Sequence, residues 1–183
     1  MSSIYQKALD ELAGVFEGLD DGEVDQAVEA IAKARRVMLY GVGREGLQVK
    51  GLAMRLFHLG LDVGVVGDMT TAPIGAGDLL VVSAGPGDFS TVAALMKTAA
   101  GNGAKTLCIT AQPNGACPEM ADHVVAIPAQ TMANDTGGST SVLPMGSLFE
   151  GAQYILFEGI ILKLKERLGV SAEAMRQNHT NLE

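Results

Sequence analysis

The chain has 183 residues, of which 48% are apolar and 19% are charged, and its net charge is −8. This composition is that of an ordinary globular protein with enough residues for one core. The acidic excess argues against nucleic acid and anionic membranes as partners, because both need clustered Lys and Arg. We find no apolar run of about 18 residues and no pattern of a secretory signal, so we expect a cytoplasmic protein without a membrane span.

Two helices are predicted before the first strand. An apolar stripe at helical spacing runs through residues 2–19, and a second stripe follows the break at residues 20–22. Asp21 or Gly22 is the expected cap of the second helix, and basic residues stand at its C-terminal end, where cations are favoured. A minimal α/β sheet does not need these two helices. They could cover one face of the sheet or pair with another subunit.

The next stretch predicts a strand, a glycine loop and a helix. The short apolar run at 37–40 is typical of a buried strand, and Gly41, Gly43 and Gly46 predict a tight loop. Apolar residues then recur at steps of three and four over 47–59, the period of an amphipathic helix. A helix N-terminus after such a loop suits an anion. The alternative is that the glycines only allow close packing of the helix against the strand.

Four more predicted strands alternate with helices. The strands are expected at 63–66, 78–83, 105–110 and 123–127, and the helices over 89–101, around 120–121, over 145–168 and over 171–177. The crossovers are long enough for parallel pairing. We therefore predict an α/β fold with three layers, in which a five-stranded parallel sheet has the flavodoxin-like order 2-1-3-4-5. We expect one domain over 1–183, with N-terminal helices at 1–35, an α/β core at 36–168 and a C-terminal helix and tail at 169–183.

This strand order predicts where a ligand binds. The order reverses between the first and third strands, and ligands of such sheets bind outside the carboxyl ends of the strands at that point. The glycine loops 41–46 and 84–87 follow these two strands and should meet there. The Thr-, Ser- and Gly-rich segment 128–144 is longer than most structureless connections, which favours a functional role. The helix over 145–168 is apolar nearly all round, which favours a subunit interface.

Four short motifs lie along nearly the whole chain. They are Gly-Arg-Glu-Gly at 43–46, Met-Arg-Leu-Phe-His-Leu-Gly at 54–60, Pro-Met-Gly-Ser-Leu-Phe-Glu at 144–150 and His-Thr-Asn-Leu-Glu at 179–183. Together they resemble the sugar isomerase (SIS) domain family and, within it, the 6-phospho-3-hexuloisomerases. The resemblance implies a dimer or tetramer without a cofactor, and interconversion of a phosphorylated 3-hexulose with fructose 6-phosphate.

The resemblance also implies catalytic roles. Glu150 is the expected base, which moves a proton between adjacent carbons through a cis-enediol; without the resemblance it would only complement a helix dipole. His179 is expected to reach a neighbouring subunit's pocket and to help open the sugar ring, since a His pKa lies near working pH. His58 stands at a predicted helix end, so it is either a third catalytic residue or a helix cap.

The two loops expected to hold the substrate depart from the family pattern. The expected substrate-binding residues are Gly43, Arg44, Glu45, Ser83, Gly85, Gly87, Asp88 and Ser90. The resemblance implies that hydroxyl side chains bind a phosphate at three positions which here hold Glu45, Gly85 and Asp88. A carboxylate beside a phosphate costs roughly 1 kcal/mol or more per charge pair at about 4 Å. Arg44 could bind the substrate or pair with these acids. Glu45, His58 and Asp88 lack the spacing of metal ligands, so we predict no metal.

Three classes of function remain open at this point. The first is an isomerase of a sugar or sugar phosphate, with a non-phosphorylated or otherwise altered substrate as one of its forms. The second is a non-catalytic sugar-binding or sensing module, and the third is a structural oligomer without a ligand. The presence of Glu150 and His179 favours the isomerase. We also expect a homo-oligomer, namely a tetramer built from dimers.

Overall fold

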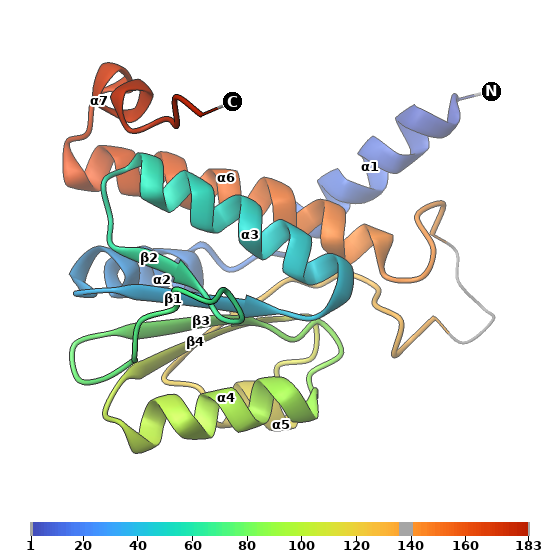
Figure 1. Ribbon diagram of the computed structural model, residues 1–183. Coiled ribbons are helices and arrows are strands. Elements are labelled where there is room, and N and C mark those ends of the chain that lie inside the picture. The colour runs from blue at the N-terminus through green and yellow to red at the C-terminus, as the bar shows by residue number, and fades with distance from the viewer. Residues whose placement is uncertain (1, 136–140, 183) are drawn as a thin grey trace.

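The computed structural model of the chain describes residues 2–135 and 141–182, with a central sheet between two layers of helices (Figure 1). The elements in chain order are α1 (Ile4–Glu17), α2 (Asp21–Lys33), β1 (Val37–Gly41), α3 (Gly43–His58), β2 (Val63–Val65), β3 (Leu79–Ser83), α4 (Ser90–Gly101), β4 (Lys105–Thr110), α5 (Ala116–Glu119), β5 (His123–Ala126), α6 (Ser147–Leu168) and α7 (Ala172–Gln177). The five predicted strands and the helices between them are confirmed.

All five strands are parallel and lie in the order β2-β1-β3-β4-β5, as the sequence predicts. Successive side chains of a strand point to opposite faces of a sheet, and the two cores follow this alternation. Leu39, Val81 and Ile109 belong to the core beneath α2, α3 and α6. Their neighbours Met38 and Leu80 belong to a second core under α4 and α5. This division gives the three predicted layers.

Helices α2, α3 and α6 cover one face of the sheet, whereas α4 and α5 cover the other (Figure 1). Helices α3 and α6 pack side by side, and Arg55 of α3 donates two hydrogen bonds to Glu158 of α6, at 2.9 and 3.1 Å. The N-terminal helix α2 is joined to α6 by Lys163, whose ammonium lies 2.6 Å from Asp25. The second N-terminal helix therefore covers the sheet, one of the two predicted uses.

One helix cap agrees with the sequence prediction and one differs. Ser171 accepts a hydrogen bond from the N–H of Ala174 and caps α7 as predicted. The cap of α2 is Asp20 rather than Asp21 or Gly22, because the Asp20 carboxylate accepts the N–H of Gly22 at 2.7 Å.

The predicted glycine loop after β1 is shorter than expected. Helix α3 begins at Gly43 after the single residue Val42, so Glu45 and Gly46 lie in the first turn of the helix. The glycines allow this close approach, because a Cβ at Gly46 would lie 2.5 Å from the carbonyl oxygen of Gly41. The packing role of these glycines is therefore confirmed, whereas anion binding at the N-terminus of α3 stays a prediction.

Two further predictions are corrected, and one falls partly outside the described residues. Leu47 is 65% exposed and does not belong to the apolar face of α3. The short helix α5 spans Ala116–Glu119 and ends before the predicted residues 120–121, with Met120 as its C-terminal cap. Of the segment 128–144, residues 136–140 lie outside the described residues.

Helix α1 holds part of that segment. The N–H of Val142 donates to the Glu11 carboxylate of α1 at 2.9 Å.

Within the described residues, no helix combines the length and the apolar character that a membrane span needs. The single domain and the cytoplasmic location stay predictions.

Candidate active site

The loops that follow β1 and β3 meet at the C-terminal edge of the sheet, as the strand order predicts. Gly41 and Ser83 are paired neighbours at the ends of these strands, so their chains leave the sheet side by side. The loops border a cavity of about 440 Å³, which α6 and the segment after β5 complete. Its lining consists of Val42, Gly43, Arg44, Glu45, Pro86, Phe89, Thr131, Met132, Met145, Gly146, Phe149 and Glu150.

Glu45 is a buried side chain that links these loops. Its carboxylate oxygen Oε2 accepts a hydrogen bond from the Ser83 hydroxyl at 2.5 Å and another from the N–H of Gly85 at 3.0 Å. The Ser83 oxygen in turn accepts a hydrogen bond from Nε2 of Gln153 at 2.7 Å. The sequence predicted Glu45 as a substrate-binding residue or a partner of Arg44. Only 8% of Glu45 is exposed, so it is not a solvated loop acid.

The electrostatics of Glu45 are those of a buried acid. Burial raises the pKa of Glu45, and the hydrogen bonds from Ser83 and Gly85 offset part of that rise. Its place in the first turn of α3 also favours a negative charge, because the helix dipole is positive there. Burial is the largest of these effects, so the pKa of Glu45 is raised overall, and Glu45 holds a proton more readily than a solvated glutamate does.

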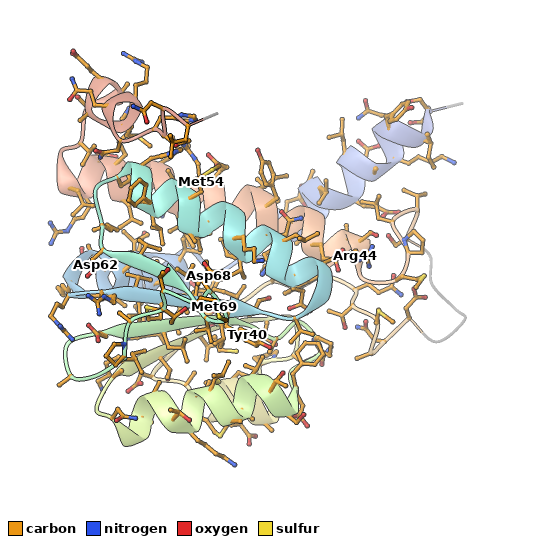
Figure 2. All side chains as sticks on the ribbon, viewed as in Figure 1. Tyr40, Arg44, Met54, Asp62, Asp68 and Met69 are labelled. Carbon is orange, nitrogen blue, oxygen red and sulfur yellow. The ribbon has the colours of Figure 1, made fainter. Side chains whose placement is uncertain are left out.

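Arg44 pairs with Glu150 and not with Glu45. Its Nε lies 3.1 Å from Oε2 of Glu150, and its Nη1 donates to the Ser147 hydroxyl at 3.0 Å. Another guanidinium nitrogen donates to the carbonyl oxygen of Met145. Figure 2 shows Arg44 at the beginning of α3, next to the chain that leads into α6. The arginine therefore ties the first turn of α3 to the first turn of α6.

The turn before α6 has an unusual backbone. Met145 has φ of 57° and Gly146 has φ of 83°, both in the left-handed region that L side chains seldom adopt. The Asp135 carboxylate accepts the N–H of Met145 at 2.7 Å, and Arg44 binds the Met145 carbonyl. Hydrogen bonds to the N–H and to the carbonyl of Met145 thus stabilise a strained turn, which sets the position of Glu150 one turn later.

Glu150 is a partly buried carboxylate at the cavity wall. Its side chain is 15% exposed. Burial raises the pKa of Glu150, the Arg44 charge lowers it, and the nearby Glu45 charge raises it again. A raised pKa brings a carboxylate closer to neutral pH, where a base is most effective in proton transfer.

Five of the eight predicted substrate residues are absent from the cavity lining. Two of them, Ser83 and Gly85, are buried and donate hydrogen bonds to Glu45. Asp88 and Ser90 are exposed, and Ser90 begins α4 without capping it. Gly87 is buried against the next loop, where an added Cβ would lie 2.8 Å from Cβ of Gln112. Asp88 and Glu45 were expected to face one pocket, but only Glu45 lines it. The turn at Gly87, with φ of 85°, directs Asp88 outward.

The two histidines lie at the other end of α3. The rings of His58 and His179 stack with centroids 5.1 Å apart, and the Asn178 amide donates to the carbonyl oxygen of His58 at 3.0 Å. Helix α3 spans 16 residues from Gly43 to His58, a rise of about 22 Å. Within one chain the histidines are therefore remote from Glu150, and His58 faces His179 and not the cavity.

A model of the SIS domain family matches residues 30–150 of this chain. The chain belongs to the SIS domain family. It is 38% identical over 174 residues to the 3-hexulose-6-phosphate isomerase of Mycobacterium gastri, which covers 95% of this chain and 87% of that protein. It is 33% identical over 180 residues to the 3-hexulose-6-phosphate isomerase of Bacillus subtilis, with 96% and 95% covered.

A solved structure from the same family shares the fold. The crystal structure of a Methanococcus jannaschii protein, with an inferred function of 3-hexulose-6-phosphate isomerase, is 27% identical to this chain. The two superpose with a TM-score of 0.83 over 98% of each chain. The resemblance found in the four motifs is therefore confirmed.

Two side chains of the site were not predicted from the sequence. Gln153 is fully buried and supports Ser83, and its Oε1 finds no hydrogen-bond partner among the described residues. Phe149 packs its ring against Gly85. The sequence did carry a signal for Gln153, because it is a polar residue on an otherwise apolar helix face, three positions and about one helical turn after Glu150.

Within the described residues, no group of three or more His, Cys, Asp or Glu is arranged to hold a metal.

Proposed function

We propose that this protein is a sugar isomerase which moves the carbonyl group of a sugar or sugar phosphate between adjacent carbons, with Glu150 as the base. One observation carries the proposal: the Glu150 carboxylate, 15% exposed, lies at the cavity wall beside Arg44. The site belongs to a SIS-domain chain whose relatives are named 3-hexulose-6-phosphate isomerase.

The reaction needs one proton to move between two carbons. A base removes the proton from the carbon next to the carbonyl, which leaves a cis-enediolate, and the same group returns the proton to the neighbouring carbon. The second hydroxyl loses its proton and the first oxygen gains one, so one carbon is oxidised and its neighbour reduced. Burial raises the pKa of Glu150, which suits a group that must both take and return a proton.

Arg44 is the one basic residue among the described residues that line the cavity. Its guanidinium stays charged at any working pH and sits beside the base. It can therefore stabilise the negative charge that develops on the substrate oxygens. Its bonds to Ser147 and Met145 hold it in place before the substrate arrives.

A second subunit supplies the histidines in this proposal. Large apolar side chains are exposed on the outer side of the α3–α6 pair, namely Leu47, Met54, Phe57, Tyr154 and Leu162, each between 54% and 65% exposed. Figure 2 shows Met54 projecting from α3 near its histidine end. An apolar strip of this kind is typical of a protein interface.

A twofold contact along this strip would bring the histidine end of one subunit toward the cavity end of the other. His179 then opens the sugar ring in the neighbouring site, while His58 orients it by stacking. We propose a homodimer of this kind, and a tetramer formed from two such dimers.

Exchange with heavy water tests the chemistry directly. The protein is incubated in D₂O with 3-hexulose 6-phosphate, fructose 6-phosphate and a panel of free ketoses, and deuterium on carbon is followed by NMR. Glu150→Gln keeps the size and the hydrogen bonding of the side chain but removes the proton acceptor. We expect kcat to fall by about 10²- to 10⁴-fold while KM changes little.

Glu166→Gln is the matched control, since Glu166 is an exposed acid on the same helix α6. Its rate should stay within about twofold of the parent. An undiminished rate in Glu150→Gln would transfer the role of base to another group. Ligand binding without any exchange would instead indicate a sensing module.

A further inference from the structure

Two hydrogen-bond donors at the end of β3 are occupied by a carboxylate of the protein itself. The Ser83 hydroxyl and the Gly85 N–H converge on one oxygen, Oε2 of Glu45, at 2.5 and 3.0 Å. These donors stand at the carboxyl end of β3, next to β1, where open α/β sheets bind phosphates and other anions. Two donors within 3.0 Å of a single oxygen are the kind of arrangement that would hold a phosphate oxygen.

Both donors are already used. The Ser83 hydroxyl has one proton, which it gives to Glu45, and its oxygen accepts from Gln153 at 2.7 Å. The Gly85 N–H has no second proton to offer. A phosphate entering here must therefore displace the Glu45 carboxylate, which is held in place by two hydrogen bonds and is 92% shielded from solvent, since only 8% is exposed.

The space and the charge also oppose a phosphate. The Gly85 position is so tight that a single added carbon would lie 2.8 Å from Oε1 of Glu45 and 2.9 Å from the Phe149 ring. The charged groups of the cavity lining are Glu45, Glu150 and Arg44, two acids against one base, and Arg44 is already bound to Glu150. A phosphate dianion at this end would meet like charges at short range.

Glu45 can still bind a substrate. Its second oxygen, Oε1, receives no hydrogen bond from the described residues, and Glu45 lines the cavity. An acceptor without a donor at a cavity wall suits a hydroxyl group, which carries its own proton.

We propose that Glu45 determines substrate specificity: it fills the anion site made by Ser83 and Gly85, so that the substrate enters this end of the cavity with a neutral, hydroxyl-bearing carbon in place of a phosphate. The statement that a free sugar is the substrate rests on the proposed isomerase function. The statement that Glu45 excludes phosphate concerns binding and does not depend on turnover.

Binding of phosphate is the direct test. Inorganic phosphate and fructose 6-phosphate are titrated calorimetrically into the parent, Glu45→Gln and Glu45→Ser. Glu45→Gln removes the charge but keeps the site filled, whereas Glu45→Ser removes both. We expect the affinity for both ligands to rise in the order parent, Gln, Ser, with at least about a tenfold gain from parent to Ser. Glu166→Ser, which removes one charge from an exposed position of α6, should leave both affinities unchanged.

The parent decides the question even if Glu45→Ser does not fold. A parent that binds fructose 6-phosphate at least as tightly as Glu45→Gln, or that turns over a sugar phosphate faster than the corresponding free sugar, overturns the inference. Failure of the proposed function looks different. In that case deuterium exchange is absent or unaffected by Glu150→Gln, while the order of phosphate affinities still stands.

Discussion

The contact between Glu45 and Gly85 can be tested through stability with the substitution Gly85→Ala. An ideal Cβ at this position would lie 2.8 Å from Oε1 of Glu45 and 2.9 and 3.0 Å from two carbons of the Phe149 ring. Real Cβ atoms essentially never come this close to their neighbours. The Phe149 ring is 1% exposed and enclosed by the core, so it cannot swing into solvent.

The size of the effect follows from two opposing contributions. Overpacking a core by one methyl group costs about 1–3 kcal/mol of the free energy of unfolding. Gly85 has no positive φ, so alanine adds no backbone strain, and the lower entropy of the unfolded chain returns about 0.4–1 kcal/mol. We expect a net loss of about 1–2 kcal/mol, which lowers Tm by about 2–8 °C for a chain of this length.

A double-mutant cycle then isolates the contact. Glu45→Ser removes the carboxylate but leaves the Phe149 ring, so the cost of Gly85→Ala should fall by about 0.5–1.5 kcal/mol in that background. Urea denaturation followed by circular dichroism gives the four free energies of unfolding. All four proteins are measured at one concentration, because association shifts the apparent stability.

Gly101→Ala is the control for this cycle. Gly101 ends α4 on the other face of the sheet, and nothing lies within 4 Å of its added Cβ. It should be neutral or stabilising by up to about 1 kcal/mol, and additive with Glu45→Ser. Equal costs of Gly85→Ala in both backgrounds, to within about 0.5 kcal/mol, would refute the contact and with it the description of Glu45 as a plug of the anion site.

Three other predictions concern catalysis and assembly. Arg44→Met removes the charge that lowers the pKa of Glu150, so activity on the acid side should be lost at a higher pH than in the parent. The pH dependence of kcat/KM checks this, and an unchanged acid limb would contradict it. Light scattering should give a mass above the 19.0 kDa of one chain. If His179 then acts across a dimer, mixing inactive Glu150→Gln and His179→Ala subunits should restore about a quarter of the parent's activity; no recovery would exclude the shared site.

The fold was accessible from the sequence because it depends on local periodicity. Apolar runs of strand length alternate with helical stripes, and parallel crossovers leave few strand orders to consider. The same order places the carboxyl ends of β1 and β3 side by side, so the location of the cavity followed as well. Boundaries were less certain. The first turn of α3 contains two glycines, which local propensity assigns to a loop.

The roles of individual acids depended on tertiary contacts. Glu45 and Asp88 are equivalent in the sequence, since each stands in a glycine loop after a strand. The left-handed turn at Gly87 directs Asp88 to solvent, whereas the first turn of α3 carries Glu45 onto Ser83 and Gly85. The sequence left Arg44 either to bind the substrate or to pair with one of these acids, and in the structure it pairs with Glu150, more than 100 positions away.

The sequence by itself determined the layers, the strand order, the family and the identity of Glu150 as the candidate base. Only the tertiary structure decided that Glu45 fills an anion site and that His58 and His179 lie far from Glu150 in the same chain. The physical reason is the separation along the sequence over which each kind of interaction acts. Periodicity and turn chemistry act over a few residues, whereas the partner of a buried charge is chosen by whichever groups the packing of distant segments brings within about 3 Å.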